Sequence, residues 1–224
     1  AHRTIALALD ELCAARPGQR IGELARHWCH APQREDAPKA VGYAYQAGSA
    51  ALNALAPADA IDYFTTAARL IGEHGVADSA MALDLAIGLG AAQRQTGDPA
   101  SRQTLLDAGA RAAELGDTER LVRAVLANDR GWHSTTGAAD GEKIALLELA
   151  LERLPPDVPD RALVLGTLCA ELAFGSTLER RRALADEALA IAKATGDDAI
   201  IVRTLNHMAF SLTLPSLLES SLEW

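Results

Sequence analysis

Residues 44–67, AYQAGSAALNALAPADAIDYFTTA, contain the pattern that determines the fold. Small or aromatic residues stand at helical spacing on either side of the break at Ala56-Pro57: Ala44, Ala47 and Gly48 before it, and Ala60, Phe64 and Ala67 after it. Because glycine has no side chain, Gly48 is expected to let the two helices of this pair touch. Phe64 is expected to fill the gap to the neighbouring pair. The stretch therefore predicts two antiparallel helices joined by a short turn.

The composition supports helices along the whole chain. Its 224 residues are 49% hydrophobic but only 4% aromatic, and Ala and Leu, the strongest helix formers, supply most of the apolar share. Residues that favour strands are scarce, so a sheet would have little to build with. An all-α fold is expected.

Helical periodicity divides the chain into eleven segments punctuated by Gly, Asp and Pro. The recurring pair Gly-Asp at 97–98, 116–117 and 196–197 marks joints between antiparallel helices, because Gly adopts the left-handed conformation that ends one helix and Asp caps the next. Pro38 is expected in the first turn of the third helix. The expected helices span about residues 3–15, 21–30, 38–54, 58–73, 79–95, 101–115, 118–128, 139–154, 160–174, 178–195 and 198–212.

Internal repetition distinguishes a stacked array from a simple bundle. Residues 44–67 resemble the tetratricopeptide repeat, and Leu89-Gly90 repeats the small-residue signal, with Leu106 expected in place of the aromatic residue and Arg102 departing from the usual Ala. The interval from Ala44 to the equivalent Ala86 is longer than the usual ~34 residues, and later units match only in helix pairing and length. The resemblance implies a right-handed superhelix of antiparallel helix pairs, a tetratricopeptide-like α-solenoid.

A more specific resemblance rests on several longer stretches. These are residues 2–9 (HRTIALAL), 21–28 (IGELARHW), 39–44 (KAVGYA) with Gly48 and Leu55-Ala56-Pro57, 88–98 (GLGAAQRQTGD) and 179–185 (ERRRALA). They resemble the segment that follows the ATPase module in large actinobacterial transcriptional regulators. Proteins of this family combine a nucleotide-binding switch ATPase with a MalT-like tetratricopeptide array and often a LuxR-type helix-turn-helix; some carry an adenylate cyclase domain.

The resemblance implies a division of the chain and a set of partners. Residues 1–36 would be a helical connector after an absent ATPase module, and residues 37–224 a repeat array truncated at its C-terminus, so the chain is expected to be an excised fragment. Its partners would be the ATPase module of the parent chain and an effector protein or small molecule. ATP would bind in the parent protein, and no cofactor is expected in this segment.

Charge and cysteine content point to an intracellular location away from nucleic acid. The formal net charge is −9, and an acidic surface repels phosphate backbones, so direct contact with DNA or RNA is not expected. Three widely separated cysteines are typical of reduced thiols in a cytoplasmic protein. No signal peptide is recognisable, and charged residues interrupt every apolar run before the ~18 residues that span a bilayer.

Several residue groups suggest chemistry but have simpler interpretations. His27 and His30 could share a helix face as metal ligands, yet Cys29 would point away and no second cluster completes a site, so no metal is expected. Ser134, His133 and Asp140 lack a nucleophile-elbow context, and no phosphate-binding loop occurs. The basic run 180–182 is flanked by acidic residues and is expected to be a solvated helix face. The chain is therefore not expected to be an enzyme.

Polar residues near the ends of the first helices are the stronger candidates for binding, because these faces line the concave surface of a superhelix. The candidates are Arg94, Asn128, Arg130, Trp132, Glu171 and Asn206 with His207. In residues 128–132 an amide, a guanidinium and an indole could together hold a carboxylate or a sugar; the same residues could instead cap helices. The leading hypothesis is a sensor or interaction domain of a transcriptional regulator. The alternative is a structural scaffold or oligomerisation arm without a small ligand.

Overall fold

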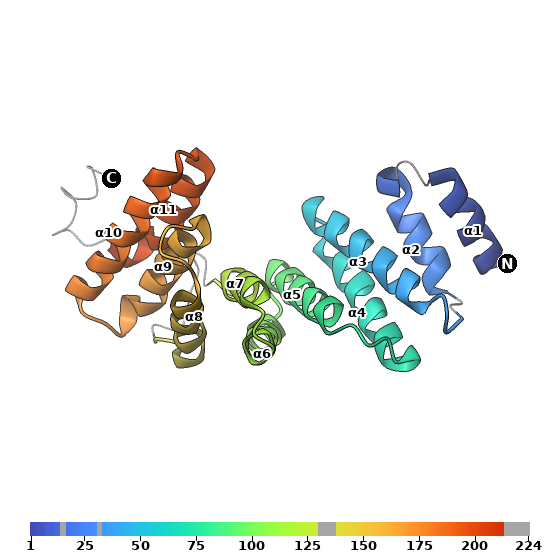
Figure 1. Ribbon diagram of the computed structural model, residues 1–224, viewed down its shortest axis with the longest axis horizontal. Coiled ribbons are helices and arrows are strands. Elements are labelled where there is room, and N and C mark those ends of the chain that lie inside the picture. The colour runs from blue at the N-terminus through green and yellow to red at the C-terminus, as the bar shows by residue number, and fades with distance from the viewer. Residues whose placement is uncertain (14–16, 31–32, 130–137, 213–224) are drawn as a thin grey trace. The chain divides into compact units, whose positions relative to one another are not determined.

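The computed structural model describes residues 1–13, 17–30, 33–129 and 138–212, and these residues form helices but no strand (Figure 1). The α-helices are α1 His2–Cys13, α2 Ile21–Cys29, α3 Ala37–Asn53, α4 Pro57–His74, α5 Ser79–Thr96, α6 Ala100–Glu114, α7 Thr118–Ala127, α8 Gly141–Arg153, α9 Pro159–Glu171, α10 Leu178–Thr195 and α11 Asp198–Leu212. The all-α class is confirmed, with helices packed against their neighbours in the chain. The superhelical arrangement and its hand stay predictions.

Two 3₁₀ turns were not foreseen from the sequence. One, Pro17–Arg20, precedes α2, and the other, Leu172–Phe174, follows α9. The helix expected over residues 160–174 therefore ends as an α-helix at Glu171 and tightens into its final turn, as helices often do at their ends.

The Gly-Asp joints have the predicted conformation. Each glycine has a positive φ, and each aspartate accepts a hydrogen bond from a backbone N–H at the start of the following helix. The glycine φ values are 75° at Gly97, 70° at Gly116 and 65° at Gly196, and the accepted bonds are Asp98 Oδ1 from Ala100 N (2.9 Å), Asp117 Oδ1 from Arg120 N (3.0 Å) and Asp197 Oδ1 from Ala199 N (2.8 Å). Pro38 lies in the first turn of α3, also as predicted.

The turn between α3 and α4 contains the one described non-glycine residue with a positive φ. Leu55 has a φ of 56°, and its side chain is 82% exposed. A side chain in the left-handed region crowds the following carbonyl oxygen, so this turn is strained without any compensating burial.

The chain divides into a first unit, Ala1–Leu105, and a second unit, Leu106–Trp224. The boundary falls within α6, between two consecutive buried leucines. The division expected at residues 36 and 37 concerns the organisation of a parent protein and stays a prediction.

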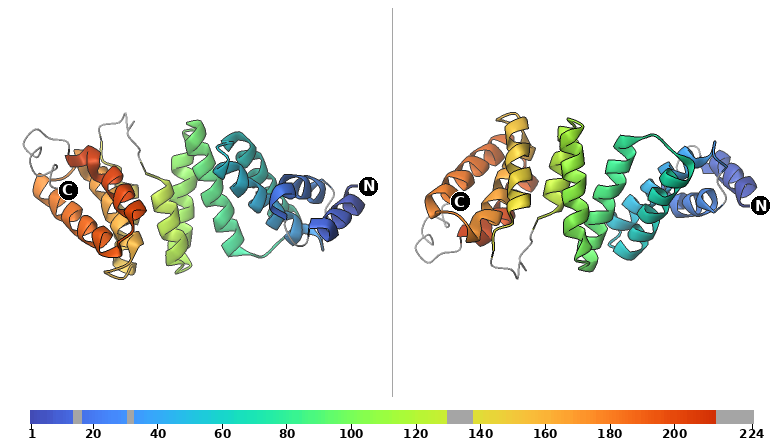
Figure 2. Two further views of the ribbon diagram at one scale, coloured as in Figure 1. Left: turned by 90° about the horizontal axis from the view of Figure 1, so that it is seen from above. Right: turned by 90° about the horizontal axis from the view of Figure 1, so that it is seen from below.

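Phe64 is the centre of the first unit's core. Its ring is 1% exposed and lies between two helical glycines: an ideal Cβ on Gly48 of α3 would come within 2.7 Å of the ring, and one on Gly88 of α5 within 2.6 Å. Phe64 therefore fills the space between neighbouring helix pairs, as the sequence predicted. The views of Figures 1 and 2 both show α3 and α4 side by side.

The next pair repeats this contact in a different register. Gly90 of α5 faces Leu105 of α6, whose Cγ would lie 2.5 Å from an ideal Cβ on the glycine. The prediction of Leu106 at this place was wrong by one residue. Consecutive helical residues point about 100° apart, so the rotation of α6 decides which leucine faces the glycine, and spacing alone does not determine it.

Two buried or half-buried carboxylates fix α1 to the start of α3. Arg3 Nε donates to Asp36 Oδ2 at 2.7 Å, and this hydrogen bond lowers the pKa of Asp36. Asp10 accepts from the Tyr43 hydroxyl and pairs with Lys39. Desolvation and then the Asp10 contact raise the pKa of Tyr43 to about 12.

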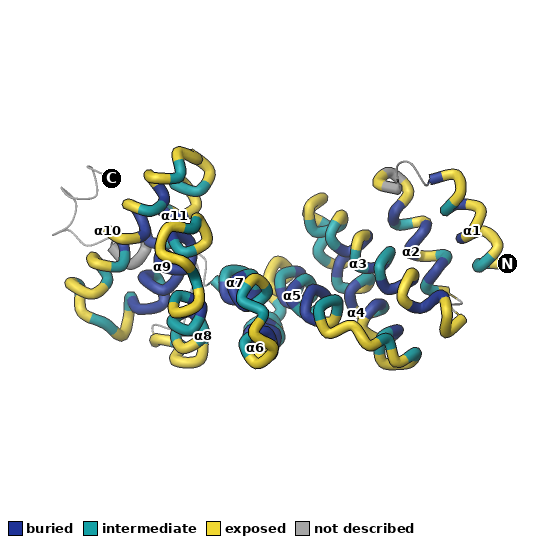
Figure 3. The backbone as a smooth tube through the Cα atoms, viewed as in Figure 1, coloured by how far each residue is buried: buried dark blue, intermediate teal, exposed yellow. Residues whose placement is uncertain are grey.

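Helix α9 is the centre of the second unit. Residues 162–169 are buried without interruption, so no side of this stretch faces solvent (Figure 3). Helices α7, α8, α10 and α11 all pack against it. Gly166 allows α11 to approach, because an ideal Cβ there would lie 3.3 Å from the Thr204 carbonyl oxygen.

Candidate functional site

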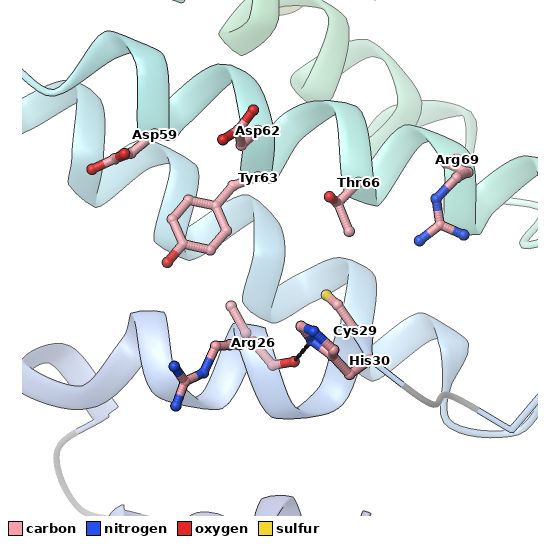
Figure 4. A pocket seen from close by; sticks show the side chains of 9 residues that line it. Arg26, Cys29, His30, Asp59, Asp62, Tyr63, Thr66 and Arg69 are labelled. Carbon is pink, nitrogen blue, oxygen red and sulfur yellow. Dashed lines mark hydrogen bonds between the residues drawn. The ribbon is translucent and has the colours of Figure 1, made fainter. Parts of the chain in front are cut away.

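A groove opens between α2 and α4 of the first unit (Figure 4). Its volume is about 640 Å³, within the range of small-molecule and peptide sites. The lining residues are Ala25, Arg26, Cys29 and His30 from α2 and the residue after it, and Asp59, Asp62, Tyr63, Thr66 and Arg69 from α4. Figure 4 shows Tyr63, Thr66 and Arg69 pointing from α4 towards α2, and Cys29 pointing back towards α4.

The groove exists because α4 has two stripes at helical spacing. The apolar stripe of Ala60, Phe64 and Ala67 is buried in the core. The polar stripe, offset from it, recurs at positions 59, 62, 63, 66 and 69 and therefore runs along one face of the helix. A single helix thus supplies both the core contact and the wall of the groove.

Tyr63 closes one end of the groove. Its hydroxyl oxygen lies 3.0 Å from the position of an ideal Cβ on Gly22, so the ring reaches across to the backbone of α2. The half-buried ring packs on a small cluster formed by Ile21, Ala25 and Ala47. A side chain at Gly22 would press on the hydroxyl, so the glycine makes room for this contact.

Opposite charges line the two ends of the α4 stripe. Asp59 and Asp62 lie in the first turns of the helix, are exposed, and form no hydrogen bond or ion pair with other residues that the structure describes. Arg69 lies two turns later, where its Nη1 pairs with Glu73 Oε2 of the same helix at 2.5 Å. An exposed pair of this kind contributes only about 0.3–0.5 kcal/mol, so the guanidinium can still bind another carboxylate.

Cys29 is poorly suited to nucleophilic chemistry. Burial raises the pKa of its thiol to about 11, against a small opposing effect of Arg69. Its Sγ lies 3.7 Å from the Ala40 carbonyl oxygen, in the position of a weak donor. The thiolate is the reactive form of cysteine, so at neutral pH this side chain is a protonated, polarisable part of the groove wall.

Three histidines gather beside the groove. His2 Nδ1 lies 3.0 Å from His27 Nδ1, and the His2 ring stacks on His30 with centroids 4.8 Å apart. His30 Nδ1 donates to the Arg26 carbonyl oxygen at 2.7 Å, because a carbonyl only accepts. Partial desolvation, followed by His30 and His27, lowers the pKa of His2. Within the described residues, no group of three or more His, Cys, Asp or Glu side chains is arranged to hold a metal ion.

The structure places the binding residues suggested by the sequence in different surroundings. Arg94 is exposed at the end of α5 in the first unit, and Asn206 is exposed on α11 in the second. Asn128 and Glu171 are buried, 6% and 1% exposed, at the ends of α7 and α9. Arg130 and Trp132 lie outside the described residues.

Two ion pairs in the second unit each include one residue of this set, His207 or Glu171. Asp129, next to Asn128, has its Oδ2 3.8 Å from His207 Nδ1, which joins the end of α7 to α11. Glu171 has its Oε1 3.8 Å from Lys143 Nζ of α8. The first contact links the end of α7 to α11 and the second links α8 to the end of α9, and none of these four residues lines the groove between α2 and α4.

Sequence reasoning missed the groove between α2 and α4, although a signal was present. The polar positions of α4 have the same helical spacing as its core positions, and α2 has a matching run at 25, 26, 29 and 30. The expected groove lay along first helices of successive pairs, whereas α2 and α4 are second helices of theirs. Searching both stripes of each helix would have found it.

No family model, curated protein or solved structure matches this chain. Among the helices of the described residues, none combines the length and the apolar character needed to cross a membrane.

Proposed function

We propose that this chain is a non-catalytic interaction domain that binds an effector or partner in the groove between α2 and α4. The observation that carries the proposal is the groove itself, towards which Tyr63, Thr66 and Arg69 point from α4 and Cys29 from α2. The Cys29 thiol in its wall is held in the protonated form, which suits a binding surface better than nucleophilic chemistry.

The sequence resemblance supplies the larger setting of this proposal. As the sensory array of an ATP-dependent transcriptional regulator, the domain would bind its effector and change how it packs on the ATPase module. An effector can shift the equilibrium between two packing arrangements only if it binds one arrangement more tightly than the other. The parent protein would then carry the ATP site and the DNA contact.

A steric block of the groove tests the binding function. Thr66 points into the groove, whereas its neighbour Thr65 is exposed and does not line it. A ligand at a hundred times its Kd adds about 2.7 kcal/mol to stability, which raises Tm by at least about 5 °C. Thermal shift across metabolite and peptide panels should yield ligands that stabilise the native chain and Thr65→Trp but not Thr66→Trp. The proposal is refuted if no compound in either panel raises the Tm of the native chain, or if the ligands raise the Tm of Thr66→Trp as much as that of the native chain.

A scaffold or oligomerisation role is the second candidate, and the outer face of α1 favours it. Ile5 is 44% exposed and Leu12 is 77% exposed, on a helix whose other face is buried. A second copy of the chain would cover these residues. Sedimentation of the native chain and of Leu12→Glu over a wide concentration range tests this role: it predicts a dimer that the substitution dissociates, and a monomer throughout excludes it.

A further inference from the structure

We propose that the histidine cluster of His2, His27 and His30 is a pH-sensitive contact, which holds α1 on α2 at neutral pH and loosens α1 as the rings protonate. This inference goes beyond the binding function proposed above and does not depend on the groove. Three features carry it: a hydrogen bond that double protonation removes, the positive charges around His2, and the small buried surface of α1.

The hydrogen bond between His2 and His27 joins α1 to α2 and depends on protonation. The two Nδ1 atoms lie 3.0 Å apart, so one of them donates and the other must keep a lone pair to accept. An imidazolium carries a hydrogen on both ring nitrogens. When both rings are charged, two N–H groups face each other and the hydrogen bond is lost. The contact is therefore favourable only while at least one of the two rings is neutral.

His30 adds a third ring to the same contact. Its centroid lies 4.8 Å from that of His2, and the centroid of His27 lies 5.1 Å from it. The Nδ1 of His30 already donates to the Arg26 carbonyl oxygen, so a further proton is taken up at its other ring nitrogen, Nε2. His2 of α1 thus lies close to two rings of the α2 segment that can each become cationic near pH ~6.5.

The charges that act on His2 are positive. Desolvation lowers the pKa of His2 first, and neighbouring cations lower it further. In order of effect, these cations are His30, His27, the Ala1 ammonium and Arg26. An imidazole whose pKa is lowered by docking takes up a proton more readily when α1 is detached. Docking is therefore favoured above about pH 6.5 and weakens as the pH falls below that value.

Carboxylates at this end of α1 already have cationic partners. Asp36 and Glu35, next to the start of α3, both pair with Arg3. Glu23 of α2 acts on His27 but is hydrogen-bonded to an arginine of the preceding 3₁₀ turn. The Arg3 contact lowers the pKa of Asp36, so this ion pair persists while the histidines titrate. Protonation of the cluster thus adds positive charge that these carboxylates offset only in part.

Only a small buried surface otherwise holds α1, which packs mainly on α2 (Figure 1). Three of its residues are buried, Ala6, Leu9 and Cys13. Towards its other end, Asp10 pairs with Lys39 of α3. Carboxylates ordinarily titrate below pH ~5, so this ion pair is not lost with the histidines. Because few apolar side chains are buried, the free energy of local opening is low, and a modest repulsion can change it measurably.

Amide hydrogen exchange of the full chain tests the inference. Protection factors, corrected for the pH dependence of intrinsic exchange, are compared at about pH 7.5 and about pH 5.5, on either side of the ordinary imidazole pKa. Two unit charges about 5 Å apart in water shift an equilibrium about fourfold. We expect the protection of α1 to fall at least about fourfold at the lower pH, while that of α4 is unchanged. The fall should shrink at high salt, because the charges are screened.

Substitutions of the central ring identify the cause. His2→Gln removes the titrating group, and His2→Phe also removes it but keeps a ring against His30. In both variants the protection of α1 should change less than about twofold over the same pH range, because the charge pairs that act on α1 are gone. His74→Gln, at the end of α4, removes a histidine outside the cluster and should keep the pH dependence of the native chain.

The possible outcomes distinguish this contact from a general effect of acid. The inference is refuted if the protection of α1 is equal at the two pH values, or if it falls as much in His2→Gln and His2→Phe as in the native chain. An equal fall in α1 and α4 would show that the whole unit opens, which also refutes it. If α1 of His2→Gln is too weakly protected to measure, His2→Phe decides. None of these outcomes depends on whether the groove binds a ligand.

Discussion

The contact of Phe64 with two glycines can be tested by adding a single methyl group. Gly48→Ala places a Cβ 2.7 Å from Cε1 and 2.9 Å from Cδ1 and Cζ of the ring. The ring has no room to move away, because Gly88 confines its other side at 2.6 Å. Gly42 lies on the same helix with nothing within 4 Å of its ideal Cβ, so Gly42→Ala is a matched control.

The two substitutions are expected to change stability in opposite directions. In a helix interior, Ala is favoured over Gly by about 1 kcal/mol, and this gain applies to both positions. Overpacking a core costs about 1–3 kcal/mol and applies only at Gly48. Gly42→Ala should therefore stabilise the first unit by about 0.5–1 kcal/mol, whereas Gly48→Ala should destabilise it by up to about 2 kcal/mol.

Urea unfolding measures this difference when the signal comes from the first unit alone. Trp28 is 2% exposed in that unit, so its fluorescence reports on it once the other two tryptophans are replaced by Phe. Midpoints at a constant m-value give the change in free energy. In a Phe64→Leu background the penalty of Gly48→Ala should shrink by more than about 1 kcal/mol, because the clashing atoms are gone. If Gly48→Ala is as stable as Gly42→Ala, the ring does not occupy the space between the helices.

Three further predictions follow from single contacts. Leu55→Gly should stabilise the chain by about 1 kcal/mol in urea unfolding, since the left-handed turn costs Leu more than Gly and no burial is lost; no gain would mean that the turn is unstrained. Cys29 should react with iodoacetamide at pH 8 about 100-fold more slowly than a peptide cysteine, because its raised pKa leaves about 100-fold less thiolate. The same raised pKa should lower the free energy of unfolding as pH rises from about 9 to 11, because the thiol ionises in the unfolded chain but not in the folded one. Mass spectrometry of the labelled peptide and unfolding of Cys29→Ser check both statements, and a normal rate would contradict them. Lys143→Met should destabilise the second unit by about 2–3 kcal/mol because the Glu171 carboxylate is buried, and adding Glu171→Leu should recover much of the loss. Amide hydrogen exchange of α9 measures both changes, and a single substitution without effect would show that the pair is hydrated.

The helices and their joints could be predicted because they depend on local chemistry. Glycine at a left-handed end and aspartate at the next start are neighbours in the sequence, so Gly97-Asp98 identifies its joint directly. Phe64 and Gly48 were also predictable, because both helices of the pair are anchored by the short turn between them. The prediction of Leu106 in place of Leu105 was wrong because helix rotation depends on the whole packed surface.

The groove was not predicted because it depends on a contact between helices that are not consecutive. Helices α2 and α4 are separated in the chain by α3, and the spacing of their residues gives no distance between them. Glu171 illustrates a second difficulty: a charged residue near a helix end is most often exposed, yet here it is 1% exposed beside Lys143. Burial of this kind is a property of the packed unit.

The continuous burial of residues 162–169 determines how the second unit opens. In a linear stack each helix pair contacts only its neighbours, so the ends can fray while the middle stays folded. Four helices pack on α9, so detaching any of them exposes part of the same central surface. The amide hydrogens of α9 should exchange with solvent only when the whole unit unfolds, with one opening free energy shared along the helix.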